Sequence, residues 1–186
     1  MVSLISPSLP FLFLLILHQS SSFSTVDVSA DSDIIIETCN RCASSDPNVN
    51  YTLCVASLES VPKARQSDLQ GLAVVAVRLA KSNMTRAKSK AKNLLKAKSL
   101  DPYMESCLET CRELYSNSIA DLEDSVKAIK SSRYGDANIL ISSAVDVPRT
   151  CEDGFDEEGL QSPLSEENDE LFGLTVIALA ITSLLG

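Results

Sequence analysis

The chain has 186 residues, of which 45% are hydrophobic, and it carries a formal net charge of −9. This length allows one domain with a substantial core and is too short for two, and the apolar content excludes a disordered tail. The negative charge argues against nucleic acid as a partner, because a phosphate backbone requires clustered positive charge.

The N-terminal segment has the features of a signal peptide. Residues 10–18 form an apolar run of the length of a signal-peptide core, and a polar, serine-rich stretch follows. The run is too short to cross a bilayer, which needs about 20 apolar residues. We expect residues 1–30 to be a signal peptide, cleaved after Ala30 or several residues earlier. The mature protein is then secreted, with no membrane association.

Six cysteines lie beyond this segment: Cys39, Cys42, Cys54, Cys107, Cys111 and Cys151. An even number in an oxidising compartment predicts disulfides and leaves several pairings open. The spacing of Cys39 and Cys42 could indicate zinc or redox chemistry. However, the only histidine, His18, lies in the leader, and neither a second such pair nor a βαβ pattern is present. We therefore predict no metal and no cofactor.

Residues 31–60 are expected to form a short helical hairpin. Residues 34–36 begin an apolar segment, the turn-forming residues 46–48 interrupt it, and a second short helix follows through Leu53 and Leu58. Closure by Cys39 and Cys54 is the simplest interpretation, because so short an element has little core of its own.

A long helix is predicted from residue 68 to residue 98, after a linker at residues 62–67. Asp68 lies in a suitable N-cap, and the segment is rich in the strong helix formers Ala, Leu and Lys. We expect one long helix, in which Ser82 and Asn83 mark the place where an irregularity could occur. Pro102 ends this helix and opens the next one.

Charge is distributed unevenly along the chain. Every charged residue in 78–98 is basic, and every charged residue in 152–170 is acidic. Solvated surfaces would explain both runs; alternatively, the basic run binds a polyanion or an acidic partner. The basic run consists of Arg78, Lys81, Arg86, Lys88, Lys90, Lys92, Lys96 and Lys98.

A longer helical hairpin is predicted from residue 107 to residue 151. Apolar residues recur every three or four positions from Leu108 to Ile129, and again from Ala137 to Val147. The short connection makes the two helices antiparallel. Cys111 near the start of the first helix then meets Cys151, just past the end of the second, and we expect a disulfide there.

The C-terminal part is predicted as a loop followed by an apolar helix. Residues 151–170 are polar and acidic and are expected to form an exposed loop. Residues 168–185 allow three interpretations: a buried helix that closes a bundle, a lipid-anchor signal removed during processing, or a transmembrane helix. The first is favoured, because the segment begins amphipathic and is short for a membrane span. Residues 61–186 then form an antiparallel four-helix bundle, and the fold class is all-α.

The mature sequence lacks the groups of common catalytic mechanisms. Without histidine, Ser–His and Cys–His nucleophile pairs are excluded. The acidic run has no apolar surroundings that would raise the pKa of a carboxyl group, as an acid catalyst requires. The sequence indicates a protein that is not an enzyme and acts through its surface. Two Asn-x-Thr sites, at Asn50 and Asn83, are candidates for glycosylation.

Five segments follow one another in the mature chain: TCNRCASSDPNVNYTLCVASL, SDLQGLAVVAVRLA, SCLETCRELYSNSIADLEDSV, YGDANILISSAVDVPRTCEDGF and LTVIALAITSLL. In this order they resemble the plant invertase and pectin methylesterase inhibitor family, over essentially all of the mature chain. The stretch DPNVNYTLCVASL is most similar to the invertase-inhibitor branch that includes pollen allergens.

The resemblance implies a disulfide-linked four-helix bundle with an N-terminal helical hairpin. It also implies the disulfides Cys39–Cys54 and Cys111–Cys151, the same two that the spacing suggested. Cys42 and Cys107 are additional to the family's four cysteines. By elimination they are expected to form a third bridge, with two free thiols as the alternative.

The resemblance further implies a secreted inhibitor that docks on a cell-wall or vacuolar invertase, or on a pectin methylesterase, and blocks its active site. Its location is then the apoplast or, alternatively, the vacuole. The competing function is a non-inhibitory module that binds pectin or other cell-wall polyanions through the basic run.

Invertase inhibitors of the family typically carry a Pro-Lys-Phe turn in the central hairpin, and the matching residues here are Ser132, Arg133 and Tyr134. A cation can pair with the catalytic carboxylates of a target hydrolase, and arginine can bind one with two hydrogen bonds. We therefore expect Arg133 and the neighbouring Tyr134 to contact the target. Alternatively, Arg133 is solvated and Tyr134 packs on the bundle.

Overall fold

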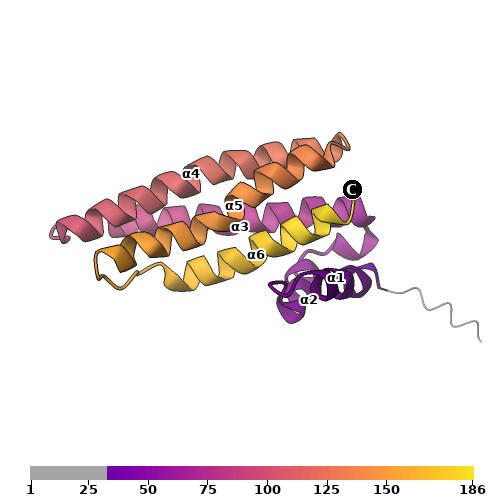
Figure 1. Ribbon diagram of the computed structural model, residues 1–186, viewed down its shortest axis with the longest axis horizontal. Coiled ribbons are helices and arrows are strands. Elements are labelled where there is room, and N and C mark those ends of the chain that lie inside the picture. Colours follow the sequence, from indigo (N-terminus) through magenta and orange to yellow (C-terminus); the bar gives the residue numbers. More distant parts are fainter. Residues whose placement is uncertain (1–32) are drawn as a thin grey trace, which may run out of the picture. The chain divides into compact units, whose positions relative to one another are not determined.

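The computed structural model describes residues 33–186, whose regular secondary structure is entirely helical, with no strand (Figure 1). The all-α prediction is confirmed, and the predicted signal peptide lies outside the described residues. The helices are α1 (Ile34–Ser45), α2 (Tyr51–Glu59), the short 3₁₀ helix η1 (Ala64–Gln66), α3 (Leu69–Leu94), α4 (Pro102–Lys130), α5 (Tyr134–Glu157) and α6 (Ser165–Ser183).

The four long helices form the predicted bundle. α3 packs on α4 and α6, and α5 packs on the same two helices from the other side. Short connections make each helix antiparallel to the next, as expected for such bundles. The core is filled by fully buried side chains from all four helices, among them Leu72, Leu108, Ile141 and Leu171.

The helices begin where the sequence provides side-chain caps. Asp33, Asn50, Asp68 and Asp101 each accept a hydrogen bond from a backbone N–H in the first turn of α1, α2, α3 and α4. Such a cap contributes about 1 kcal/mol, since it satisfies a donor that has no partner within the helix. Pro102 opens α4 as predicted, because the first helical position needs no N–H donor.

Two predicted helix boundaries were wrong. α3 is continuous through Ser82 and Asn83 and ends at Leu94, four residues before the predicted end. α5 continues through Cys151 to Glu157, and α6 begins at Ser165, so only residues 158–164 of the predicted acidic loop are outside helices. The polar composition of this stretch conceals Phe155, which is fully buried and extends the apolar face of α5 by one turn.

The hairpin of α1 and α2 packs mainly against α6 and α3. A Cβ atom on Gly173 of α6 would lie 2.6 Å from Cδ2 of Leu53, so glycine at this position allows the close approach of α2. Arg65 of η1 forms ion pairs with both Asp33 and Glu59. It thereby connects the start of α1 to the end of α2.

α6 is the fourth helix of the bundle, as the favoured interpretation of the C-terminal segment predicted. It contacts both α3 and α5, and its buried residues include Leu171, Ile177 and Ile181. A processed anchor signal would have no such packing. Within residues 33–186, none of the helices combines the length and apolar character needed to cross a membrane.

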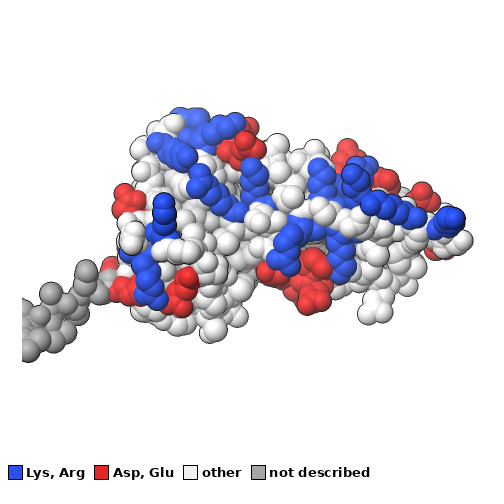
Figure 2. Space-filling view, turned by 180° about the vertical axis from the view of Figure 1, so that it is seen from behind, with Lys and Arg blue, Asp and Glu red and all other residues white. Residues whose placement is uncertain are grey.

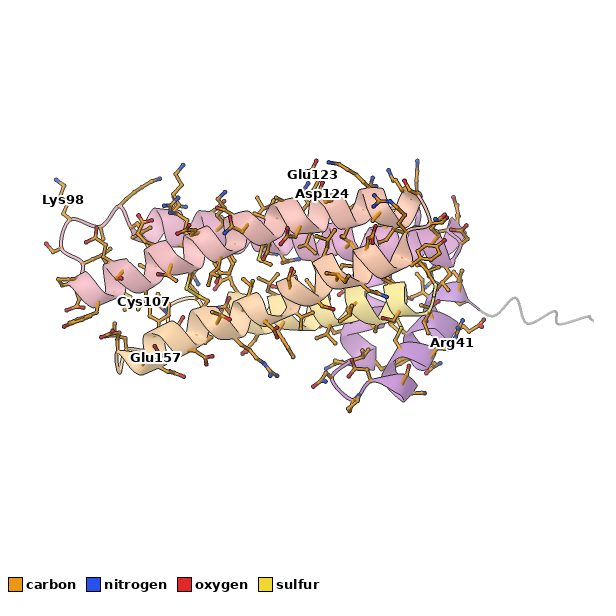
Figure 3. All side chains as sticks on the ribbon, turned by 45° about the horizontal axis from the view of Figure 1, so that its top comes forward. Arg41, Lys98, Cys107, Glu123, Asp124 and Glu157 are labelled. Carbon is orange, nitrogen blue, oxygen red and sulfur yellow. A yellow bond between two sulfur atoms is a disulfide. The ribbon has the colours of Figure 1, made fainter. Side chains whose placement is uncertain are left out.

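The two disulfides that the sequence suggested are present in the structure. Cys39–Cys54 closes the N-terminal hairpin, and Cys111–Cys151 joins α4 to α5. The third bridge was a wrong prediction, because Cys42 and Cys107 are free and buried. Cys107 lies at one end of the bundle, whereas Arg41, next to Cys42, lies at the other (Figure 3). Counting cysteines could not show this separation.

A polar cluster is buried where α4, α5 and α6 meet. The Tyr115 hydroxyl donates to Oδ1 of Asn168 at 2.6 Å and lies 3.2 Å from Sγ of Cys151. The amide of Asn168 donates to Oε1 of Glu152. Burial raises the pKa of Tyr115, so its hydroxyl remains a donor well into the alkaline range. The cluster satisfies buried polar atoms that would otherwise destabilise the core.

Removal of each disulfide should destabilise the protein according to the length of the loop it closes. The two cysteines are 15 residues apart in Cys39–Cys54 and 40 apart in Cys111–Cys151. Constraint of the unfolded chain predicts losses of about 3 and about 4 kcal/mol for the two double-alanine variants. Urea unfolding would measure both, with Cys42→Ala as the single-thiol control. An unchanged free energy of unfolding in Cys111→Ala/Cys151→Ala would contradict this prediction.

Tyr115→Phe should destabilise the bundle by about 1–3 kcal/mol, because it leaves Oδ1 of buried Asn168 without its donor. Tyr103→Phe is the matched control, since Tyr103 is 60% exposed. Its effect should stay within about 0.5 kcal/mol. Thermal or urea unfolding would compare the two variants, and equal stability of both would show that the Tyr115 hydroxyl adds nothing.

Candidate functional site

The turn between α4 and α5 is fixed by a regular helix-ending motif. The N–H of Arg133 donates to the carbonyl of Ala128 at 2.9 Å, and the N–H of Ser132 donates to that of Ile129 at 2.9 Å. These two bonds form a Schellman motif, which requires a left-handed residue at the position of Ser132. Ser132 has a φ of 56° and is the only non-glycine residue with positive φ in residues 33–186. The turn therefore has one defined backbone conformation.

The same motif ends α5, where the sequence supplies glycine for the left-handed position. The N–H of Leu160 donates to the carbonyl of Phe155 at 2.9 Å, and Gly159 has a φ of 67°. Glycine adopts this conformation without cost, whereas serine in its place costs of the order of 1 kcal/mol. The α4–α5 turn thus contains a locally unfavourable residue that the surrounding structure holds in place.

Tyr134 packs inward and attaches the turn to the bundle. It is half-buried against the core, and its hydroxyl donates to Oγ of Ser132 and accepts from Nε2 of Gln70, each at 3.3 Å. Gln70 also donates to the carbonyl of Ile129 at 2.7 Å, so α3 holds both sides of the turn. The structure therefore agrees with the alternative in which Tyr134 is a packing residue.

Arg133 points into solvent at the tip of the hairpin. Its side chain is 58% exposed, and its guanidinium pairs with Asp136 at 2.6 Å. An exposed pair of this kind contributes at most about 1 kcal/mol, so Arg133 can exchange Asp136 for another carboxylate at little cost. Of the two predicted contact residues, Arg133 is exposed, whereas Tyr134 is half-buried and holds the turn against α3.

Ile139 is an exposed residue of this surface that the sequence analysis did not identify. It lies on α5 one turn after Asp136 and is 72% exposed, the largest value among the exposed large hydrophobic residues of the described chain. The sequence contains a signal for it, because Ile139 is out of phase with the apolar stripe through Ala137, Ile141 and Ala144. The first two turns of α5 thus carry one exposed apolar side chain, six residues after Arg133.

The basic run lies mostly on α3, and Figure 2 shows a band of basic side chains on this face of the molecule. Three of its members are ion-paired: Lys81 with Glu123 at 3.0 Å, Lys90 with Glu167 at 2.7 Å, and Arg86 with Glu170 at 3.8 Å. The hydrogen bond from Lys81 lowers the pKa of Glu123. Part of the acidic run is therefore an internal partner of α3, and the other five residues of the basic run form no ion pair within residues 33–186.

The two free thiols are poorly suited to act as nucleophiles. Burial raises the pKa of Cys42 to about 11. Burial, with a contribution from nearby Glu158, also raises the pKa of Cys107, whose thiol donates to the carbonyl of Gly154 at 3.2 Å. A reactive cysteine requires the opposite shift, toward the thiolate. In the described part of the chain, no group of three or more His, Cys, Asp or Glu residues could hold a metal ion.

The two predicted glycosylation sites lie in different local structures. Asn50 is exposed and caps α2 through its side-chain oxygen, which accepts from the N–H of Leu53 at 3.0 Å. Asn83 is half-buried within α3, and its amide nitrogen donates to the carbonyl of Leu79 at 3.1 Å. Of these two asparagines, only Asn50 has an amide nitrogen without a hydrogen-bond partner among residues 33–186.

Comparison with known proteins agrees with this architecture. Two crystal structures of a pectin methylesterase inhibitor from Arabidopsis share the fold. One, from Arabidopsis thaliana, has a TM-score of 0.60 at 22% identity, covering 84% of this chain and 98% of its own. The other, a mutant form, has a TM-score of 0.67 at 21% identity, covering 83% and 99%.

Sequence comparison identifies the family. A Platanus orientalis protein named "Putative invertase inhibitor" is 41% identical over 155 residues, covering 83% of this chain and 91% of its own. A pectinesterase inhibitor of Actinidia deliciosa is 31% identical over 175 residues, covering 94% and 91%. The model of the plant invertase/pectin methylesterase inhibitor family matches residues 33–181. The chain therefore belongs to the plant invertase/pectin methylesterase inhibitor family.

Proposed function

We propose that this protein is a secreted inhibitor that docks on a plant invertase and blocks its active site with the α4–α5 turn. The observation that carries the proposal is the exposed guanidinium of Arg133 on a turn fixed by the Schellman motif and by Tyr134. A pectin methylesterase is the second target class, because relatives of both kinds match the chain.

The turn suits a target whose active site contains carboxylates. Arginine offers a planar pair of donors that can bind a carboxylate with two hydrogen bonds, and its charge persists at every physiological pH. The local backbone is ordered before binding, so docking loses little conformational entropy there. Ile139, which is exposed on α5 six residues after Arg133, offers apolar area that a partner could bury, as anchor residues do in many protein interfaces.

The relatives favour invertase over pectin methylesterase as the first target. The Platanus relative is more similar to this chain than the Actinidia relative, at 41% against 31% identity. Arg133 and Tyr134 keep the order of a basic and then an aromatic residue found in the Pro-Lys-Phe turn of invertase inhibitors, which also supports invertase as the target. The protein is accordingly proposed to act in the apoplast, where cell-wall invertase is located.

Arg133→Glu should weaken inhibition of invertase by about 30-fold or more, which is the loss expected for an interface residue worth about 2 kcal/mol. Arg133→Lys should retain part of the affinity, since it keeps the charge and loses the paired donors. The measurement is titration of a fixed amount of acid invertase, at acidic pH, with the secreted protein and each variant.

Lys98→Glu is the matched control, because Lys98 lies at the end of the bundle opposite the α4–α5 turn and undergoes the same charge change (Figure 3). Its inhibition curve should coincide with that of the unmodified protein. A parallel titration against pectin methylesterase tests the second target, and loss of that activity alone would overturn the invertase assignment. If neither enzyme is inhibited, the competing proposal of a non-inhibitory pectin-binding module is favoured.

We expect a glycan on Asn50 and none on Asn83, because the Asn83 amide is half-buried within α3 and is already hydrogen-bonded. Thr52→Ala removes the first acceptor sequence and leaves the Asn50 cap intact. It should lower the mass of the secreted protein by one glycan, whereas Thr85→Ala should leave that mass unchanged apart from the substitution itself. Mass spectrometry before and after enzymatic deglycosylation checks this, and a glycan that survives Thr52→Ala would contradict it.

A further inference from the structure

α3 has an unusual charge for a helix of this protein. It contains no acidic residue, in a chain whose net charge is −9. Its six basic residues are Arg78, Lys81, Arg86, Lys88, Lys90 and Lys92, and Lys96 and Lys98 follow its end. A charged helix of a soluble protein usually mixes both signs, because opposite charges one turn apart stabilise it and like charges repel. The positive charge of α3 must therefore be balanced by acidic groups outside the helix, either elsewhere in the protein or on a ligand.

Lysines in one row along α3 lack an acidic partner. Lys88, Lys92 and Lys96 recur every four residues, so they lie along one side of the helix and its C-terminal turn. None of the three forms an ion pair within residues 33–186, whereas Arg86 and Lys90 are neutralised by α6. The uncompensated charge of α3 is thus concentrated in this lysine row.

A hollow of about 500 Å³ runs beside this row on the surface of α3. Its lining residues are Thr85, Arg86, Ser89, Lys90, Asn93 and Leu94. Thr85, Ser89 and Asn93 also recur every four residues and form a neutral row between the lysine row and the ion-paired Arg86 and Lys90. The hollow is therefore lined by hydroxyl and amide side chains together with Arg86, Lys90 and Leu94, and the lysine row follows on the other side of the neutral row.

The neutral row can hydrogen-bond a ligand rich in hydroxyl groups. The hydroxyls of Thr85 and Ser89 donate to the carbonyls of Lys81 and Thr85, both at 2.8 Å, so their oxygens can still accept from a ligand. The side-chain oxygen of Asn93 accepts from Lys96 at 2.8 Å. Its amide nitrogen has no partner among residues 33–186 and can donate.

We propose that this hollow binds a linear acidic polysaccharide with a carboxylate on each sugar. The lysine row would pair with successive carboxylates, and the neutral row would hydrogen-bond the sugar hydroxyls between them. No large exposed hydrophobic residue of the described chain lies on α3. The surface therefore lacks the aromatic side chains that stack on nucleic-acid bases and the apolar side chains that insert into a lipid surface.

This site is separate from the α4–α5 turn. Gln70, which contacts the turn, is 15 residues before Thr85, or about 22 Å along the axis of α3 (15 × 1.5 Å). Polysaccharide binding is therefore independent of enzyme inhibition, and each can fail without the other.

The test is affinity electrophoresis of the secreted protein in gels that contain polygalacturonate. Retardation is expected at low ionic strength and should disappear as salt screens the lysine row. Highly methyl-esterified pectin should cause no retardation, because it lacks the carboxylates. Equal retardation by polyphosphate would overturn the proposal, since it would show general attraction to polyanions without recognition of the sugar.

Lys88→Glu/Lys92→Glu/Lys96→Glu should weaken binding about tenfold or more, from the loss of three exposed pairs and the added repulsion. Arg41→Glu/Lys63→Glu/Lys130→Glu is the matched control, with the same change in net charge at exposed cations off α3. It should bind as the unmodified protein does. Similar losses in both triple variants would overturn the assignment to α3.

Thr85→Ala/Ser89→Ala/Asn93→Ala tests the neutral row without any change in charge. Alanine favours the helix more than the residues it replaces, so a loss of binding here cannot result from an unfolded α3. Several-fold weaker binding is expected, with enzyme inhibition unchanged. Unaltered binding of polygalacturonate by this variant would remove the sugar-binding role of the hollow.

Discussion

The junction at Cys151 is the constraint on which the rest of the structure depends. Its sulfur is bonded to Cys111 of α4, and it lies 3.2 Å from the Tyr115 hydroxyl and 3.3 Å from the Asn168 amide of α6. One residue of α5 thus fixes the register of α5 against both of its neighbours. From this junction to the turn, α4 runs 19 residues (130 − 111) and α5 runs 17 (151 − 134), so the two arms are of similar length and a tight turn can join them.

The acidic residues near the junction stabilise the structure locally. The carboxylate of Glu152 accepts hydrogen bonds from Ser162 and Ser165 at 2.8 and 2.7 Å and also binds Asn168, so it attaches the connection 158–164 to α5. Glu167 and Glu170 of α6 form ion pairs with Lys90 and Arg86 of α3, respectively. The acidic run is therefore divided between an internal connector and counterions for α3. The lysine row is uncompensated, because the ion pairs from α6 to α3 go to Arg86 and Lys90.

Local sequence signals predicted most of the fold, because helix caps, apolar periodicity and proline act within a few residues. Asp68 and Asp101 illustrate this, since each is followed by a helix that begins where the cap indicates. The failures came from long-range packing. Nothing local to Cys42 or Cys107 indicates that they lie at opposite ends of the bundle, and Phe155 is a single apolar residue in an acidic segment whose burial depends on its neighbours. For the same reason, sequence analysis predicted the same role for Arg133 and Tyr134. Their roles differ because Tyr134 packs toward α3, whereas Arg133 is exposed, and the local sequence does not show this.

The backbone conformation of Ser132 determines which residues the α4–α5 turn can contain. Ser132 has a φ of 56°, and proline is restricted to φ near −65°, so proline cannot occupy this position in this conformation. The turn of this chain therefore differs from the Pro-Lys-Phe turn in all three side chains and in the φ of position 132. Its rigidity comes instead from the Schellman hydrogen bonds and from the contact of Tyr134 with Gln70 of α3. In this chain the aromatic ring of Tyr134 is turned toward the bundle, and of the two side chains only that of Arg133 is exposed.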